Sequence, residues 1–284
     1  MLNDAEHDQY SELVTQSEDE MAVMKYLLTQ YNLKAGLRHF GEKGVAAAKG
    51  KLTQLHVMDT WVPEDLAMLS RSEKVRALSS LMFLKENRSG KIKGRACVNE
   101  APQRAYIRNE NTYSPTVANE SVFITSVIAA HKKCFVRCYD VPGAFFHTES
   151  DENVLMVLRG ELAGMMVHIA PQIYQPYAKM DKNGTPILYV RLKKALYGLL
   201  RSILLFYRKL RGELEAYGFK INPYDPCVGK KMVTTETVVP VIDKKGRIIR
   251  NNNWSKKMCK VKEEKQTTVI WHVDDLMMSC EDNF

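Results

Sequence analysis

The sequence predicts an α+β fold, because segments with helical periodicity alternate with pairs of strand-like segments joined by turn signals. One such pair surrounds the turn cluster Asn87-Arg88-Ser89-Gly90, and another surrounds Asp274-Asp275. Between them, residues 195–217 are predicted to form a long helix that stops at Gly218, because glycine commonly follows a helix C-terminus. A chain of 284 residues is long enough for one large domain or two modest ones.

Charge is distributed unevenly along the chain. Residues 1–20 hold seven acidic residues and no Lys or Arg, whereas the rest of the chain holds 41 basic residues against 26 acidic ones. We therefore predict a disordered acidic leader over 1–20, a helical segment over 21–60 and a basic body that either binds a polyanion or merely has a basic surface. Salt dependence separates these two alternatives, because nucleic-acid affinity falls steeply with ionic strength.

The six cysteines show no zinc-like pairing, which predicts buried free thiols in a reducing compartment. No apolar run reaches the roughly 18–20 residues that span a bilayer, and no secretory signal opens the chain. We therefore expect an intracellular protein that is not secreted and has no membrane partner. The sequence leaves the oligomeric state open.

Two places carry acidic residues where strands are predicted to end. Asp140 follows an apolar strand and precedes a Pro-Gly break, and Asp274-Asp275 lies between two apolar runs. If folding brings them together, three carboxylates make a hard-oxygen site for Mg²⁺. Two such ions about 4 Å apart can activate a hydroxyl and stabilise a leaving oxygen in phosphoryl transfer. The alternative is an ordinary turn, because turns are rich in Asp.

The predicted hairpin after residue 87 carries alternating cations. Lys91, Lys93 and Arg95 are two residues apart, which places them on one face of a strand. They indicate either a surface that binds anions or a solvated edge protected by charge.

Several separated motifs, in order, resemble copia-type retrotransposon reverse transcriptases over about residues 40–284. The matching segments are Thr60-Trp61, the region from Phe83 to Arg95, Ser114-Pro115-Thr116-Val117, Asp140-Val141 with Ala144-Phe145, Leu196-Tyr197-Gly198-Leu199, Gly218-Phe219 with Asp225-Pro226-Cys227, and Val273-Asp274-Asp275. The resemblance implies the fingers and palm of a right-hand polymerase over 61–284, with an antiparallel palm sheet backed by helices.

The resemblance also implies a role for each matching residue. Asp140, Asp274 and Asp275 would be catalytic and would bind two Mg²⁺ ions, with Mn²⁺ as a possible substitute. The residues expected to bind the incoming nucleotide are Lys93, Arg95, Phe145, Tyr197 and Gly198. Among these, Phe145 would exclude a ribose 2′-hydroxyl, and Lys93 and Arg95 would contact the triphosphate. The partners would be an RNA or DNA template-primer and deoxynucleoside triphosphates, and the location a cytoplasmic particle or the nucleus.

The sequence departs from the family in two places. The strip from Leu200 to Tyr207 is apolar and proline-free where many members continue Lys-Gln-Ala-Pro-Arg, and His272 replaces a common Tyr. The chain ends nine residues after Asp275, so we expect no thumb or RNase H and weak or absent polymerisation. Two alternatives follow: a catalytically dead, retrotransposon-derived nucleic-acid-binding protein, or a metal-dependent nuclease.

Overall fold

The computed structural model describes residues 30–105, 112–253 and 255–281. The predicted acidic leader lies outside these residues. The protein belongs to the mixed α+β class, as predicted, and divides into two compact units. Unit 1 comprises Met1–Thr112 and Phe145–Ser202, and unit 2 comprises Tyr113–Ala144 and Ile203–Phe284. No helix of the described part has the length and apolarity needed to cross a membrane.

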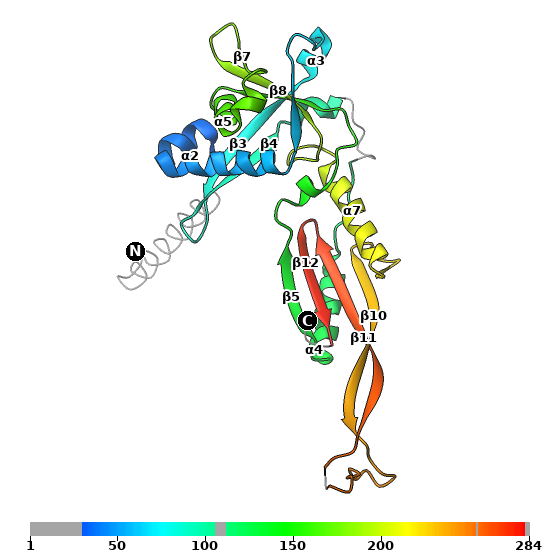
Figure 1. The fold of residues 1–284 in the computed structure, drawn as a ribbon. Coiled ribbons are helices and arrows are strands. Elements are labelled where there is room, and N and C mark those ends of the chain that lie inside the picture. The colour runs from blue at the N-terminus through cyan, green and yellow to red at the C-terminus, as the bar shows by residue number, and fades with distance from the viewer. Residues whose placement is uncertain (1–29, 106–111, 254, 282–284) are drawn as a thin grey trace, which may run out of the picture. The chain divides into compact units, whose positions relative to one another are not determined.

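Unit 1 is built on a seven-stranded sheet that is antiparallel except where β3 meets β6 (Figure 1). Its strands are β1 (Tyr31–Asn32), β2 (Trp61–Glu64), β3 (Leu78–Glu86), β4 (Ile92–Val98), β6 (Leu155–Arg159), β7 (Lys179–Met180) and β8 (Pro186–Leu192). Its helices are α2 (Leu33–Val57), α3 (Arg71–Arg76), α5 (Glu161–Ile169) and α6 (Pro171–Tyr174), and short 3-10 turns occupy η1 (Ala101–Ala105) and η3 (Ala144–His147).

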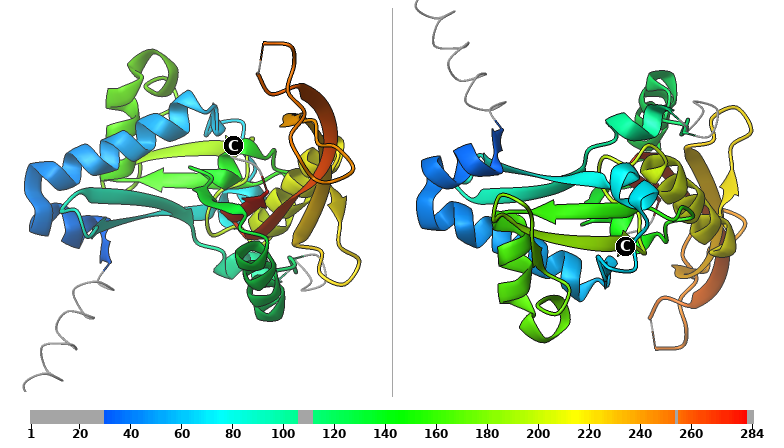
Figure 2. Two further views of the ribbon diagram at one scale, coloured as in Figure 1. Left: turned by 90° about the horizontal axis from the view of Figure 1, so that it is seen from below. Right: turned by 90° about the horizontal axis from the view of Figure 1, so that it is seen from above.

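Helix α2 lies across one face of this sheet (Figure 2). It begins where the Asn32 side chain accepts the Ala35 N–H at 2.9 Å, and it buries Leu52 and Leu55 against the strands. Close approach to β4 is possible because Gly94 has no side chain: a Cβ there would lie 2.9 Å from the Ala47 carbonyl oxygen. The α2 contact therefore fixes the strand on which Lys93 and Arg95 lie.

Unit 2 contains a five-stranded antiparallel sheet in the order β5-β12-β11-β10-β9. Its strands are β5 (Phe135–Asp140), β9 (Lys220–Ile221), β10 (Val228–Pro240), β11 (Met258–His272) and β12 (Asp275–Cys280), and its helices are α4 (Asn119–His131) and α7 (Ser202–Ala216). Strands β10 and β11 continue past the rest of the sheet as a two-stranded arm (Figure 1).

The two helices of unit 2 lie over opposite faces of its sheet. Leu204 and Tyr207 of α7 pack on Val269 and Trp271, which alternate onto one face of β11. Helix α4 lies over the other face and is fixed at both ends by polar contacts. The buried Asp225 carboxylate accepts the Ala118 N–H at 3.0 Å, and Lys132 bonds Glu281 at 2.7 Å.

Two sequence-based boundaries are wrong. The helix predicted over 195–217 begins only at Ser202, because Gly198 has a φ of +88° and residues 196–199 close a turn instead. The high charge of residues 243–265 favours an exposed loop, but the segment is strand from Met258 onward. Strand propensity gives the wrong prediction here, because Lys and Glu are uncommon in strands but are tolerated in a two-stranded ribbon exposed to water.

The prediction of buried free thiols holds in part. The cysteines of the described residues are free, and Cys227 is fully buried. Cys138 and Cys259, however, are exposed.

Candidate functional site

The carboxylates predicted to carry chemistry meet at one end of the unit 2 sheet. Asp140, the last residue of β5, lies directly opposite Asp275, the first residue of β12. The Val141 N–H donates to the Asp274 carbonyl oxygen at 3.1 Å, so the β5 end is joined to the turn itself. Antiparallel register thus brings together acidic residues that are more than 130 positions apart in the sequence.

The turn between β11 and β12 is tight and strained. Val273 and Asp274 are its two central residues, and Val273 has a φ of +56°. A β-branched residue in this region is an outlier, because glycine normally fills the positive-φ position of a two-residue hairpin turn. Strained backbone of this kind is concentrated at functional sites, where it fixes the direction of neighbouring side chains.

The carboxylates of Asp140 and Asp275 are exposed, and their Cα atoms are partners in register. None of the ion pairs formed by the described residues includes either one. Like charges directly opposite each other in a sheet are destabilising, and a bound cation relieves that repulsion. Within the described ranges, no three His, Cys, Asp or Glu side chains form a group that could hold a metal ion. Carboxylate oxygens are the ligands that Mg²⁺ prefers, and Asp140 and Asp275 supply them. Only these two acidic residues of the described part are partners in register.

A hollow of about 530 Å³ borders these carboxylates. Asp140, His272 and Asp275 contribute to its wall, and the rest is mostly apolar. Trp271, also in the wall, is 2% exposed, and its indole Nε1 has no hydrogen-bond partner among the described residues. His272 lies opposite Asp275 in register, so it flanks the carboxylate pair on the side away from Asp140.

Three of the five residues predicted to bind the nucleotide gather in unit 1. The Tyr197 ring makes an edge contact with the Phe145 ring at 4.5 Å between centroids, and the Arg95 guanidinium lies 5.1 Å from the Tyr197 centroid. Phe145 is only 4% exposed, whereas Arg95 is exposed. The stack therefore presents a cation supported by an aromatic ring, with Phe145 behind it.

Gly198 is fixed by backbone contact with β4. The Val98 N–H donates to the Tyr197 carbonyl oxygen at 2.8 Å, and a Cβ on Gly198 would lie 2.1 Å from the Val98 carbonyl oxygen. The Leu-Tyr-Gly-Leu motif thus has a structural explanation: only glycine permits this turn against the strand that bears Arg95.

The β3–β4 hairpin places cations side by side. Lys93 is exposed and lies directly opposite Lys85, and Arg95 lies opposite Phe83 two positions further along. A like-charged pair in this position costs stability unless an anion compensates it. The sequence indicated the alternation of Lys93 and Arg95, but only the register identifies Lys85 as their neighbour.

A partly buried ion-pair network supports the segment after Gly198, and sequence reasoning missed it. Arg201 bonds Asp151 at 2.7 Å and Glu152 at 3.5 Å, and burial raises the pKa of the Glu152 carboxyl while Arg201 opposes that rise. The Glu152 carboxylate in turn accepts a hydrogen bond from the side-chain amide nitrogen of the fully buried Gln103. The side-chain oxygen Oε1 of Gln103 accepts the Leu200 N–H. No local pattern joins these three segments, so no sequence signal could have revealed the network.

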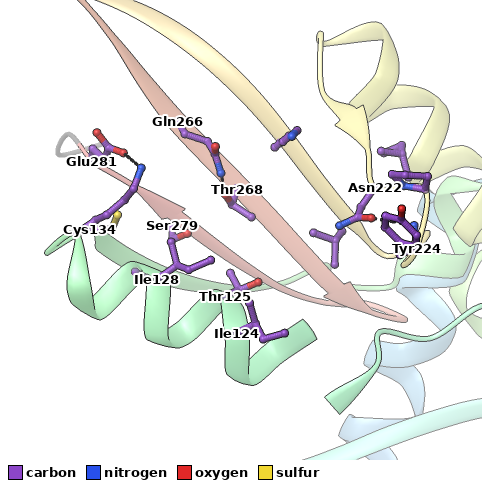
Figure 3. Close-up of a pocket in the computed structure, with 16 residues that line it drawn as sticks. Ile124, Thr125, Ile128, Cys134, Asn222, Tyr224, Gln266, Thr268, Ser279 and Glu281 are labelled. Atoms are coloured by element: carbon purple, nitrogen blue, oxygen red, sulfur yellow. Dashed lines mark hydrogen bonds and ion pairs between the residues drawn. The ribbon is translucent and has the colours of Figure 1, made fainter. Parts of the chain in front are cut away.

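A second hollow, of about 420 Å³, separates α4 from the unit 2 sheet (Figure 3). Ile124 and Ile128 line its helix side, while Thr268 and Ser279 line its sheet side. Its wall also contains Lys132, Cys134, Lys230 and Glu281, and Lys132 forms an ion pair with Glu281 at 2.7 Å.

The search for known relatives gives no identification. No protein-family model, no curated protein and no solved structure matches this chain. Function must therefore be inferred from the geometry and from the motifs.

Proposed function

We propose that this protein is an RNA-directed DNA polymerase of the copia-type reverse transcriptase family, with fingers in unit 1 and palm in unit 2. The observation that carries the proposal is the register pairing of Asp140 with Asp275 beside the strained Val273-Asp274 turn. Carboxylates that converge in this way can supply ligands for the two metal ions of nucleotidyl transfer. The ordered series of motifs supports the same assignment.

Asp140, Asp274 and Asp275 would hold Mg²⁺ or Mn²⁺. When bound, the ions would supply activation of the attacking hydroxyl and stabilisation of the leaving oxygen. The exposed pair of Asp140 and Asp275 supports this role, because a bound cation would relieve the repulsion between the two opposed carboxylates.

The residues of unit 1 would bind and orient the nucleotide. Arg95 and Lys93 supply charge-assisted hydrogen bonds for a triphosphate, and Lys85 adds a third cation in register. Phe145 is buried behind Tyr197, so any effect on the ribose 2′-hydroxyl would act partly by holding the Tyr197 ring in place. Gly198 acts by permitting the turn that carries Tyr197.

Metal binding and primer extension test the proposal. Wild type should bind Mn²⁺, detected by electron paramagnetic resonance, and its extension of a DNA primer on an RNA template, expected to be weak, should require added Mg²⁺. Asp140→Asn and Asp275→Asn should lose both properties. Asp65→Asn is the matched control, because Asp65 is exposed and the amide can still accept the Ala67 N–H. Equal Mn²⁺ binding by all four proteins would refute the assignment.

A second candidate is a nucleic-acid-binding protein without catalysis. It is favoured by one observation: the described residues contain no group of three potential metal ligands, so the triad is incomplete as a side-chain cluster. This candidate predicts salt-sensitive RNA binding together with no Mn²⁺ binding and no extension. The same measurements therefore discriminate between the two.

A further inference from the structure

The tip of the β10–β11 arm concentrates positive charge. We define the tip as residues 241–257, which hold six basic residues and one acidic residue, a net charge of +5. The whole chain has a net charge of only +8. The six basic side chains are all exposed: Lys244, Lys245, Arg247, Arg250, Lys256 and Lys257.

The described residues of the tip, 241–253 and 255–257, form two consecutive tight turns. Val241 bonds through its backbone to both neighbouring segments: its N–H donates to the Lys257 carbonyl oxygen and its carbonyl oxygen accepts the Ile249 N–H, each at 2.8 Å. The Asp243 side chain accepts the Lys245 and Arg247 amides, and the Asn251 side chain accepts the Ser255 amide in the same way. These turns hold the cations on a fixed frame, which lowers the entropy lost when they bind a partner.

Repulsion within the tip is only partly compensated. Asp243, the single acidic residue of the tip, bonds the Arg247 side chain at 3.0 Å. The backbone amides of Arg247 and Lys245 donate to the Asp243 carboxylate and lower the pKa of that carboxyl. Arg250 and Lys256 lie directly opposite each other as an antiparallel bridge. Along the arm itself Lys260 bonds Glu236, and Lys265 bonds Glu263, so the arm balances its charge whereas the tip does not.

We propose that the tip is a nucleic-acid contact that binds the phosphate backbone of a duplex. A two-stranded β-ribbon has the dimensions to enter or bridge a major groove, and Lys and Arg side chains on it reach phosphates. The like-charged register pair Lys220–Lys230 at the base of the arm, in the same unit, fits the same polyanion. The contact positions the duplex without reading sequence. It is separate from the carboxylates and does not require that they catalyse.

The test compares two fourfold variants of the full chain. The tip variant carries Lys244→Gln, Lys245→Gln, Lys256→Gln and Lys257→Gln. The control variant carries Lys43→Gln, Lys133→Gln, Lys179→Gln and Lys182→Gln, which removes the same charge from exposed positions elsewhere. Affinity for a fluorescein-labelled DNA duplex is measured by anisotropy from about 50 to 200 mM KCl, a range over which phosphate contacts strongly change affinity.

The tip variant should bind at least about tenfold more weakly at low salt, and its log–log salt slope should be shallower by about 3 to 4, near 0.9 for each lost phosphate contact. The control variant should keep the wild-type slope, and the tip variant should keep wild-type Mn²⁺ binding, which separates this result from failure of the polymerase proposal. Equal losses in tip and control variants, or absence of duplex binding by wild type, would overturn the proposal. So would equally tight, tip-dependent binding of polyglutamate or of anionic phosphatidylserine vesicles.

Discussion

Replacing Gly198 with Ala tests the structural reading of the Leu-Tyr-Gly-Leu motif. The new Cβ would lie 2.1 Å from the Val98 carbonyl oxygen and 3.0 Å from the Val98 nitrogen, so the turn must move away from β4. A φ of +88° adds about 1–2 kcal/mol for a residue with a side chain. Loss of the 2.8 Å bond from the Val98 N–H to the Tyr197 carbonyl adds about 1 kcal/mol. The free energy of unfolding should therefore fall by about 3 kcal/mol or more.

Urea denaturation followed by circular dichroism measures this loss, and amide hydrogen exchange at Val98 locates it. Gly164→Ala is the matched control in the same unit: it lies within α5, and a Cβ there meets no atom within 4 Å. That change should stabilise the protein by about 0.5–1 kcal/mol. If Gly198→Ala costs less than about 0.5 kcal/mol and the Val98 amide stays protected, the close contact does not hold the turn.

Three further predictions concern unit 2. Asp225→Asn should lower the unfolding free energy by about 1–3 kcal/mol in urea titrations, because an amide can replace only one of the two oxygens that accept the Ala118 and Cys227 amides, and an unchanged value would contradict the α4 attachment. Burial raises the pKa of the Cys227 thiol from 9.0 to about 12. The stability contributed by the buried, protonated thiol is therefore complete below about pH 9. It is lost by about 1.4 kcal/mol per pH unit as the pH rises toward 12. Urea titrations of wild type and Cys227→Ala at pH 8 to 10 should diverge accordingly, and parallel curves would refute the burial argument. Val273→Gly should raise the melting temperature because it relieves a φ of +56°, whereas Val273→Ala should not; identical shifts would show that the turn is unstrained.

The local pattern of apolar, charged and turn-forming residues predicted two of the hairpins correctly. The alternation around Gly90 and the acidic break at 274–275 indicated the β3–β4 and β11–β12 hairpins. The helix begins at Ser202 rather than at residue 195. Local pattern predicts the earlier start because it does not distinguish a helical residue from Gly198. Its positive φ is imposed by contact with β4, which is about 100 residues earlier in the chain.

The sequence by itself determined the α+β class, the strand ends that carry Asp140, Asp274 and Asp275, and the alternation of Lys93 with Arg95, because each depends on residues that are close together in the chain. Only the tertiary structure decided that Asp140 faces Asp275 and that Arg95 lies over Tyr197. It also decided that the described residues of the basic tip, 241–253 and 255–257, form consecutive turns. Register and packing are set by contacts between segments far apart in sequence, whose geometry no local pattern encodes.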